Sequence, residues 1–109
     1  MEGFWTVQFN GVQGFGFGVV TLIGGQIFGG DSGFIYTGNY TNNGNALNAR
    51  VHVRRGARGV LNVMGRDEFD LELIGTVQND TVAATGSIPG TGQRFQARLT
   101  KQMNLPAAY

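Results

Sequence analysis

The first residues to suggest chemistry are Gly29-Gly30-Asp31-Ser32-Gly33, because Gly-Asp-Ser-Gly surrounds the nucleophilic serine in some hydrolases. A nucleophilic serine needs a base within hydrogen-bonding reach, and that base needs a group to orient it. The chain has one imidazole, on His52, and its alternation with valines predicts that it faces solvent. We therefore interpret the stretch as a turn in which Gly29-Gly30 permits an unusual backbone and Asp31 or Ser32 caps the turn.

A second candidate is the acidic cluster of Asp67, Glu68, Asp70 and Glu72. With no cysteine and a single histidine, the chain lacks the ligands of a first-row metal site, and a calcium loop needs more oxygen ligands at closer spacing. The glycine-rich residues 14–18 match neither the dinucleotide nor the P-loop pattern. We therefore expect no metal, no cofactor and no catalytic residues, and predict that the protein is not an enzyme.

The third candidate is a group of basic residues with no acidic residue between them, namely Arg50, Arg54, Arg55, Arg58 and Arg66. These residues are candidates for binding a protein partner, and Arg50, Arg54, Arg55 and Arg58 are the ones we single out. The alternative is a solvated face, partly neutralised by the acidic cluster that follows. We do not expect nucleic acid as a partner, because the aromatic residues that could stack on bases fall mostly on predicted core faces.

Alternation of apolar and polar residues runs through most of the chain and predicts strands with one buried face. It is clearest in residues 5–9, 34–40, 47–54, 69–77, 81–88 and 95–100. In residues 15–23 glycines alternate with larger apolar residues, and here we expect Phe15, Phe17, Val19 and Ile23 to face the core. Gly24-Gly25 and Asn43-Gly44 suit two-residue hairpin turns.

These elements predict one all-β domain over residues 1–109, a small antiparallel barrel of seven to eight strands with at most one short helix. Barrel closure removes the two edges that an open sheet would expose. The helix would fall in residues 55–67, where Val60, Leu61, Val63 and Met64 could form a turn over one barrel end. The length of this segment also suits a lid that controls access of a ligand.

A small barrel is either filled with side chains or holds one small ligand, and the sequence leaves both open. If it holds an apolar ligand, we expect Trp5, Phe15, Phe17, Phe34 and Tyr36 to line the site. Gly3-Phe4-Trp5 resembles the Gly-x-Trp of lipocalins and avidins. This resemblance implies that Trp5 closes one barrel end by stacking against a basic residue, for which Arg94 and Arg98 are the candidates. The N-terminus lacks a signal-peptide pattern and no apolar run approaches the length of a membrane span, so we expect a cytoplasmic protein without a membrane segment.

Several stretches together resemble one family. They are "EGFWTVQF", "GGQIFGGDSGFIYTGNY", "ARVHVRR", "FDLELIGTV" and "FQARLTK", and the likeness covers residues 2–101. They are similar to the GrlR-like proteins, named for a negative regulator of type III secretion in enteric bacteria. The most specific part is Gly29-Gly30-Asp31 followed by an aromatic strand. The resemblance implies a lipocalin-like (calycin) barrel in which Gly-Asp-Ser-Gly is a turn between strands.

The resemblance also implies a bacterial, non-enzymatic regulator that acts by protein–protein contact. The founding member sequesters a transcriptional activator as a dimer, which makes another protein the expected partner and a homodimer the expected state. That member carries an acidic run in a hairpin. The matching residues here, 41–45, contain no acid, so an interaction through such carboxylates is not implied. The alternative function is a carrier of a small apolar ligand inside the barrel.

Overall fold

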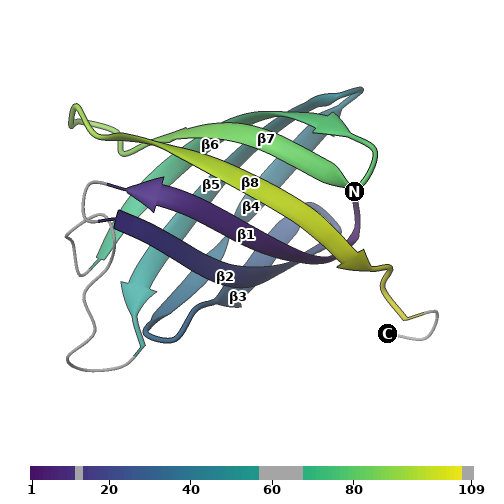
Figure 1. Ribbon diagram of the computed structural model, residues 1–109, viewed down its shortest axis with the longest axis horizontal. Coiled ribbons are helices and arrows are strands. Elements are labelled where there is room, and N and C mark those ends of the chain that lie inside the picture. The colour runs from purple at the N-terminus through teal and green to yellow at the C-terminus, as the bar shows by residue number, and fades with distance from the viewer. Residues whose placement is uncertain (12–13, 57–67, 107–109) are drawn as a thin grey trace.

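The computed structural model describes residues 1–11, 14–56 and 68–106, and these form a closed antiparallel barrel of eight strands (Figure 1). The strands are β1 (Gly3–Gly11), β2 (Gly14–Ile23), β3 (Gln26–Gly30), β4 (Phe34–Asn43), β5 (Ala46–Arg55), β6 (Glu68–Gln78), β7 (Thr81–Ser87) and β8 (Arg94–Met103). Each pairs with its neighbours in sequence, and β8 pairs with β1. The predicted all-β barrel is confirmed.

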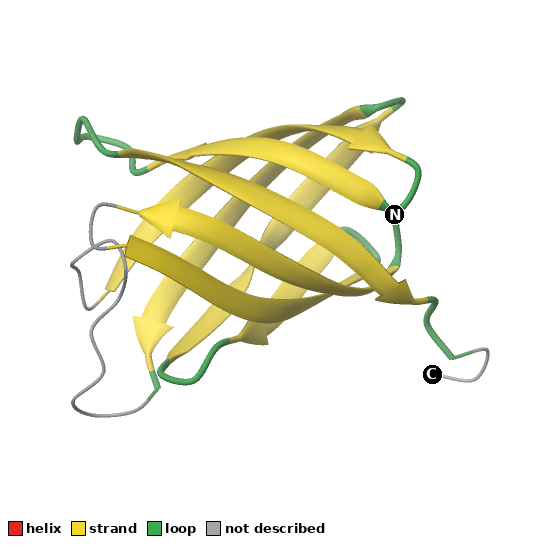
Figure 2. Cartoon of the chain, viewed as in Figure 1, coloured by secondary structure: helices red, strands yellow, loops and turns green. Residues whose placement is uncertain are grey.

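The described residues include no helix, and therefore none long and apolar enough to cross a bilayer (Figure 2). The helical turn expected at Val60, Leu61, Val63 and Met64 lies outside the described residues. One predicted boundary is wrong: Gly29-Gly30 is not part of a turn but ends strand β3, the shortest in the barrel. The predicted turn itself occupies only the residues that follow, between β3 and β4.

Tight turns connect the strands at the barrel end where β1 begins and β8 ends (Figure 2). Gly24-Gly25 has positive φ at both residues, as the sequence predicts. The next hairpin turns one residue later than expected, at Gly44-Asn45, where only Gly44 has positive φ. Asn79-Asp80 joins β6 to β7 with positive φ at Asn79, a residue type that tolerates this region of backbone space.

Side chains at alternate positions fill the barrel, and the most deeply buried ones lie toward this tight-turn end. They are Trp5, Leu22, Leu47 and Val82. The indole Nε1 of Trp5 donates a hydrogen bond to the carbonyl oxygen of Met1, 3.1 Å away, so the polar atom of this ring is satisfied. Burying one large apolar side chain contributes about 1.5–3 kcal/mol, so these four are a main source of stability.

Strand β2 faces the opposite way from our prediction. Phe17 is 54% exposed, whereas Gly18, Val20 and Leu22 point inward. The reason is space, because a Cβ at Gly16 would overlap the ring of Phe9, and one at Gly18 would come within 3.0 Å of the Tyr36 hydroxyl. Glycine therefore occupies inward positions so that aromatic rings from other strands can fill the barrel. The side chain of Phe15 lies outside the described part.

At Gly38 the absence of a side chain allows the backbones of β4 and β5 to approach closely. It pairs with Val51 of β5, and a Cβ at this position would overlap the carbonyl of Arg50 and come within 2.9 Å of the Val51 Cα. Backbone atoms cannot rotate away as a side chain can. A side chain here would therefore push β4 away from β5.

We expect Gly38→Ala to lower the free energy of unfolding by about 1–3 kcal/mol, the usual cost of forcing extra atoms into a packed structure. Gly92→Ala is the matched control, because no atom lies within 4 Å of a Cβ at that exposed position. Urea denaturation measures both. Equal stability of the two variants would contradict the close approach of β4 and β5.

Candidate functional site

Asp31 organises the turn that contains Ser32. Its Oδ1 accepts hydrogen bonds from the backbone N–H groups of Gly33 and Phe34, each 2.9 Å away, and its Oδ2 accepts one from the Tyr36 hydroxyl. The cap is therefore Asp31, one of the two residues predicted for this role, while Ser32 is exposed. The imidazole of His52 is bound to carboxylates on the outer face of β5, so it is not positioned as a base for Ser32.

Tyr36, which donates the hydrogen bond to Asp31 Oδ2, has its side chain inside the barrel. Tyr36 is buried, and burial together with the neighbouring Asp31 carboxylate raises the pKa of its hydroxyl above the usual value of 10. The phenol therefore stays protonated and can keep donating to Asp31. This bond ties the β3–β4 turn to the interior.

The interior holds an apolar cavity of about 70 Å³. Its walls include Phe9, Tyr36, Phe69, Leu73, Phe95 and Ala97. Sites for drug-sized ligands measure roughly 300–1,000 Å³, so this barrel is largely filled by its own side chains. Of the residues predicted to line a ligand site, Tyr36 borders the cavity and Trp5 and Phe34 are buried elsewhere in the core. Phe17 was also predicted to line the site, but its side chain lies on the outside of the barrel.

The expected stacking of Trp5 on Arg94 or Arg98 does not occur, because both arginines are exposed on the outside while the indole points inward. Lys101 is instead the residue opposite Trp5 on β8. A cation–π contact does form elsewhere. The Arg55 guanidinium lies 5.4 Å from the centre of the Phe34 ring, on an opposed pair of β4 and β5.

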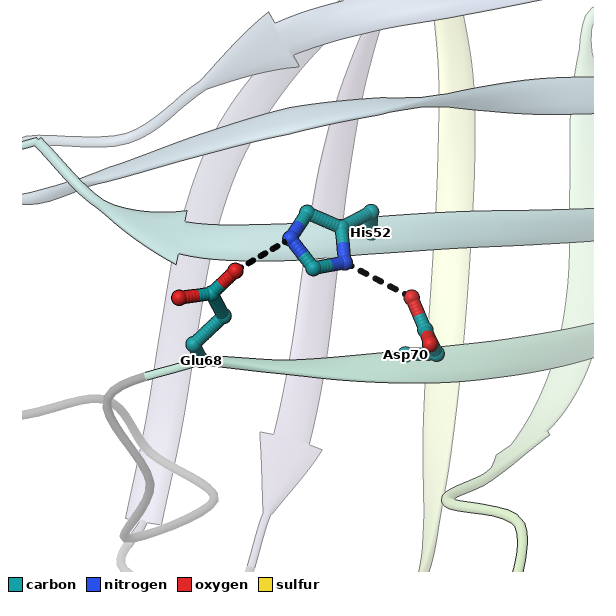
Figure 3. Close-up of polar contacts among 3 residues, drawn as sticks. All are labelled: His52, Glu68 and Asp70. Atoms are coloured by element: carbon teal, nitrogen blue, oxygen red, sulfur yellow. Dashed lines mark hydrogen bonds and ion pairs between the residues drawn. The ribbon is translucent and has the colours of Figure 1, made fainter.

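Strands β5 and β6 carry a ladder of opposite charges on their outer faces. In register, Arg50 opposes Glu72, His52 opposes Asp70 and Arg54 opposes Glu68. Arg50 Nη2 lies 2.6 Å from Glu72 Oε2. His52 contacts two carboxylates, as Figure 3 shows.

The arginines predicted as a partner site are therefore not a uniform basic patch. Arg50 is paired with Glu72, Arg54 is exposed opposite Glu68, and Arg55 packs on Phe34. Arg58 and Arg66 lie outside the described residues, as does Asp67. Within the described part of the chain, no group of histidine, aspartate and glutamate side chains is arranged to hold a metal ion.

In contrast to β5 and β6, strands β1 to β4 have no charged side chain on their outer surface. Between Gly3 and Ala49 the only charged residue is Asp31, which caps its turn. We call the outward side of these four strands the uncharged face. Its apolar residues are Phe4, Phe17, Val19, Ile23, Phe28 and Ile35. Phe28 is 46% exposed, although a large apolar side chain gains most when it is buried.

The aromatic residues of the uncharged face stand on adjacent strands. Thr21 pairs with Phe4 of β1 on one side and with Phe28 of β3 on the other, so the backbones of these two phenylalanines lie two strand spacings apart, about 10 Å. We did not predict this face from the sequence. The signal was available in the presence of a single charged residue among residues 3–49, and in residues 14–23, where Thr21 is the one residue with a polar side chain.

Comparison with known proteins does not identify this chain. No protein-family model matches it, and no curated protein sequence matches it. The function must therefore be inferred from the surfaces and the interior described above.

We expect Asp31→Ala to lower the free energy of unfolding by about 1–3 kcal/mol, because it leaves the Tyr36 hydroxyl and two backbone N–H groups without their acceptor. Ser32→Ala is the control and should change stability by less than about 0.5 kcal/mol, as is usual at exposed positions. Thermal denaturation of both variants tests this. A larger loss for Ser32→Ala would show that the cap is assigned to the wrong residue.

Proposed function

We propose that the protein is a non-enzymatic regulatory module that binds another protein through the uncharged face. The observation that carries this proposal is the combination of exposed Phe17 and Phe28 with four strands that lack any charged residue. The cores of protein interfaces are enriched in aromatic residues and depleted of charged ones. The uncharged face likewise has exposed aromatic residues and no charged ones.

The rigidity of the face favours binding. Its rings stand on hydrogen-bonded strands of a closed barrel, so docking a partner there orders few additional groups. A closed barrel also has no free strand edge, which disfavours a partner that binds by adding a strand. The partner would therefore contact side chains, and it would bring an uncharged surface, since a charge buried here would find no opposite charge.

The resemblance to GrlR-like proteins supports the regulatory part of the proposal. It suggests a bacterial, cytoplasmic negative regulator whose partner is a transcriptional regulator. It also suggests a homodimer. A second copy of the chain is a candidate occupant of the uncharged face, because two such faces brought together would oppose no like charges.

The second candidate function is a carrier of a small apolar molecule, and the apolar cavity is the observation in its favour. The size of this cavity weighs against it. A space of about 70 Å³ is well below that of an engineered cavity of about 150 Å³ known to bind benzene. A lipid would require the aromatic rings to move.

To test the docking surface, we expect Phe28→Glu and Phe17→Glu to reduce partner recovery at least about tenfold, the usual loss at a central interface residue. The assay is affinity capture from native lysate at several salt concentrations, with proteins identified by mass spectrometry. Ala83→Glu, at an exposed position on the outside of β7, is the matched control and should retain the partner. Circular dichroism confirms that each variant is folded.

Either of two results would reject this assignment. Undiminished recovery by both phenylalanine variants would exclude the uncharged face, and no protein above background at any salt concentration would oppose protein binding altogether. Sedimentation equilibrium of the same variants identifies a second copy as the occupant. A dimer that dissociates in Phe28→Glu but not in Ala83→Glu would assign the face to self-association.

To test the carrier, we expect native mass spectrometry of the purified protein to show the 11.7 kDa chain, or its multiples, without added mass. We also expect Ala97→Val, which adds two methyl groups beside the cavity, to retain partner recovery and to lose no more than about 3 kcal/mol of stability. A bound small molecule that is lost in Ala97→Val would instead favour the carrier.

A further inference from the structure

His52 makes a contact with each of its two ring nitrogens. Nδ1 lies 2.7 Å from Asp70 Oδ1, and Nε2 lies 2.8 Å from Glu68 Oε2. Figure 3 shows the imidazole between the two carboxylates, with His52 on one strand and both acids on the next. Asp70 is the register partner of His52, and Glu68 is the first residue of β6.

The protonation state of the ring determines whether both contacts can exist. A neutral imidazole has one N–H donor and one acceptor, whereas an ionised carboxylate only accepts hydrogen bonds. The imidazole can therefore donate a hydrogen bond to each of the two carboxylates only when both of its nitrogens are protonated. Loss of one proton would turn a nitrogen lone pair toward a negatively charged oxygen.

His52 is the member of the charge ladder whose ordinary pKa lies nearest neutral pH. On β5 its outward neighbours are Arg50 and Arg54, and on β6 the outward residues are Glu68, Asp70 and Glu72. On β4 its register partner is Thr37, and that strand has no charged residue. With His52 protonated, the ladder holds equal numbers of positive and negative charges, and deprotonation leaves it one negative charge in excess.

We propose that His52 is a pH-dependent clamp that in its doubly protonated form holds the beginning of β6 to β5, and on deprotonation releases one of its two carboxylates. The feature is independent of the proposed partner binding, because it acts within a strand pair outside the uncharged face. It would make the start of β6, next to the residue 57–67 connection, the part of the described barrel most sensitive to pH near neutrality.

The direction of the effect follows from the contacts. The hydrogen bonds to Asp70 and then Glu68 raise the pKa of His52 above its usual value of 6.5. A group whose pKa is raised by folding stabilises the folded state fully below the pKa of the unfolded chain, and this stabilisation is lost as the pH rises through the folded-state pKa. The clamp is therefore closed while His52 is protonated and opens as the pH rises through its raised pKa. Because the groups are exposed, concentrated salt should weaken it.

The test begins with the titration of His52 by NMR in the full chain, where a single histidine makes the imidazole signals unambiguous. We expect a midpoint above 6.5, lowered by Asp70→Asn and, to a smaller extent, by Glu68→Gln. Glu72→Gln is the matched control, since this carboxylate binds Arg50 and does not contact the imidazole. Its midpoint should stay close to that of the wild type. A wild-type midpoint at or below 6.5, or equal midpoints in all three variants, would overturn the proposal.

The second measurement asks whether the clamp holds the strand. Corrected for the intrinsic pH dependence of exchange, amide hydrogen exchange at Phe69 and at its register partner Val53 should accelerate about two- to fivefold above the midpoint. Amides at the other end of this strand pair, near Leu47, should show no such change. His52→Gln, which keeps a polar side chain but cannot titrate, should abolish the acceleration. If the wild type shows no change, or His52→Gln shows the same one, His52 titrates without clamping the strand.

Discussion

The pairing of β8 with β1 is the constraint on which the rest of the structure depends. It joins the last strand to the first over Phe4–Asn10 and Gln96–Met103, and leaves no free edge among the described strands. Once the sheet is closed, every strand has one side facing a small interior and one side facing outward. Glycines such as Gly16 and Gly18 lie on the inner side because eight strands leave too little room for a large residue at every position. Closure therefore determines which residues are left on the outside.

Charged residues are unevenly distributed over the outer surface of the barrel, and their distribution follows the order of the strands. The charged residues of β5 and β6 oppose one another in register and largely neutralise each other, while β1 to β4 present hydroxyls, amides and apolar groups. The two regions meet where Thr37 of β4 pairs with His52 of β5. The interior offers only a small cavity, so the outer surface has more capacity for recognition than the inside. This contrast is why we place the proposed function on the uncharged face.

Much of this arrangement could be predicted from the sequence, because a period of two is easy to detect where apolar and polar residues alternate. The burial of Val51, Val53 and Leu71 and the outward position of His52 follow directly from that pattern. The face of β2 could not be assigned in the same way, because its residues alternate between glycine and other apolar residues, and hydrophobicity alone favours burying Phe17. Only the rings of Phe9 and Tyr36, which arrive from other strands, explain why glycine takes the inward positions. The pairs of the charge ladder require the register of β5 against β6, which no local pattern contains.

The closure of the barrel can be measured directly by amide hydrogen exchange, followed residue by residue by NMR. If β1 and β8 are paired as described, the amides that bond across this seam, within residues 5–8 and 97–100, should be as protected as those in the centres of β4 and β5. Fast exchange along both strands, with strong protection elsewhere, would mean that the sheet is open at this seam. The inward and outward faces, and the surfaces assigned from them, would then be wrong.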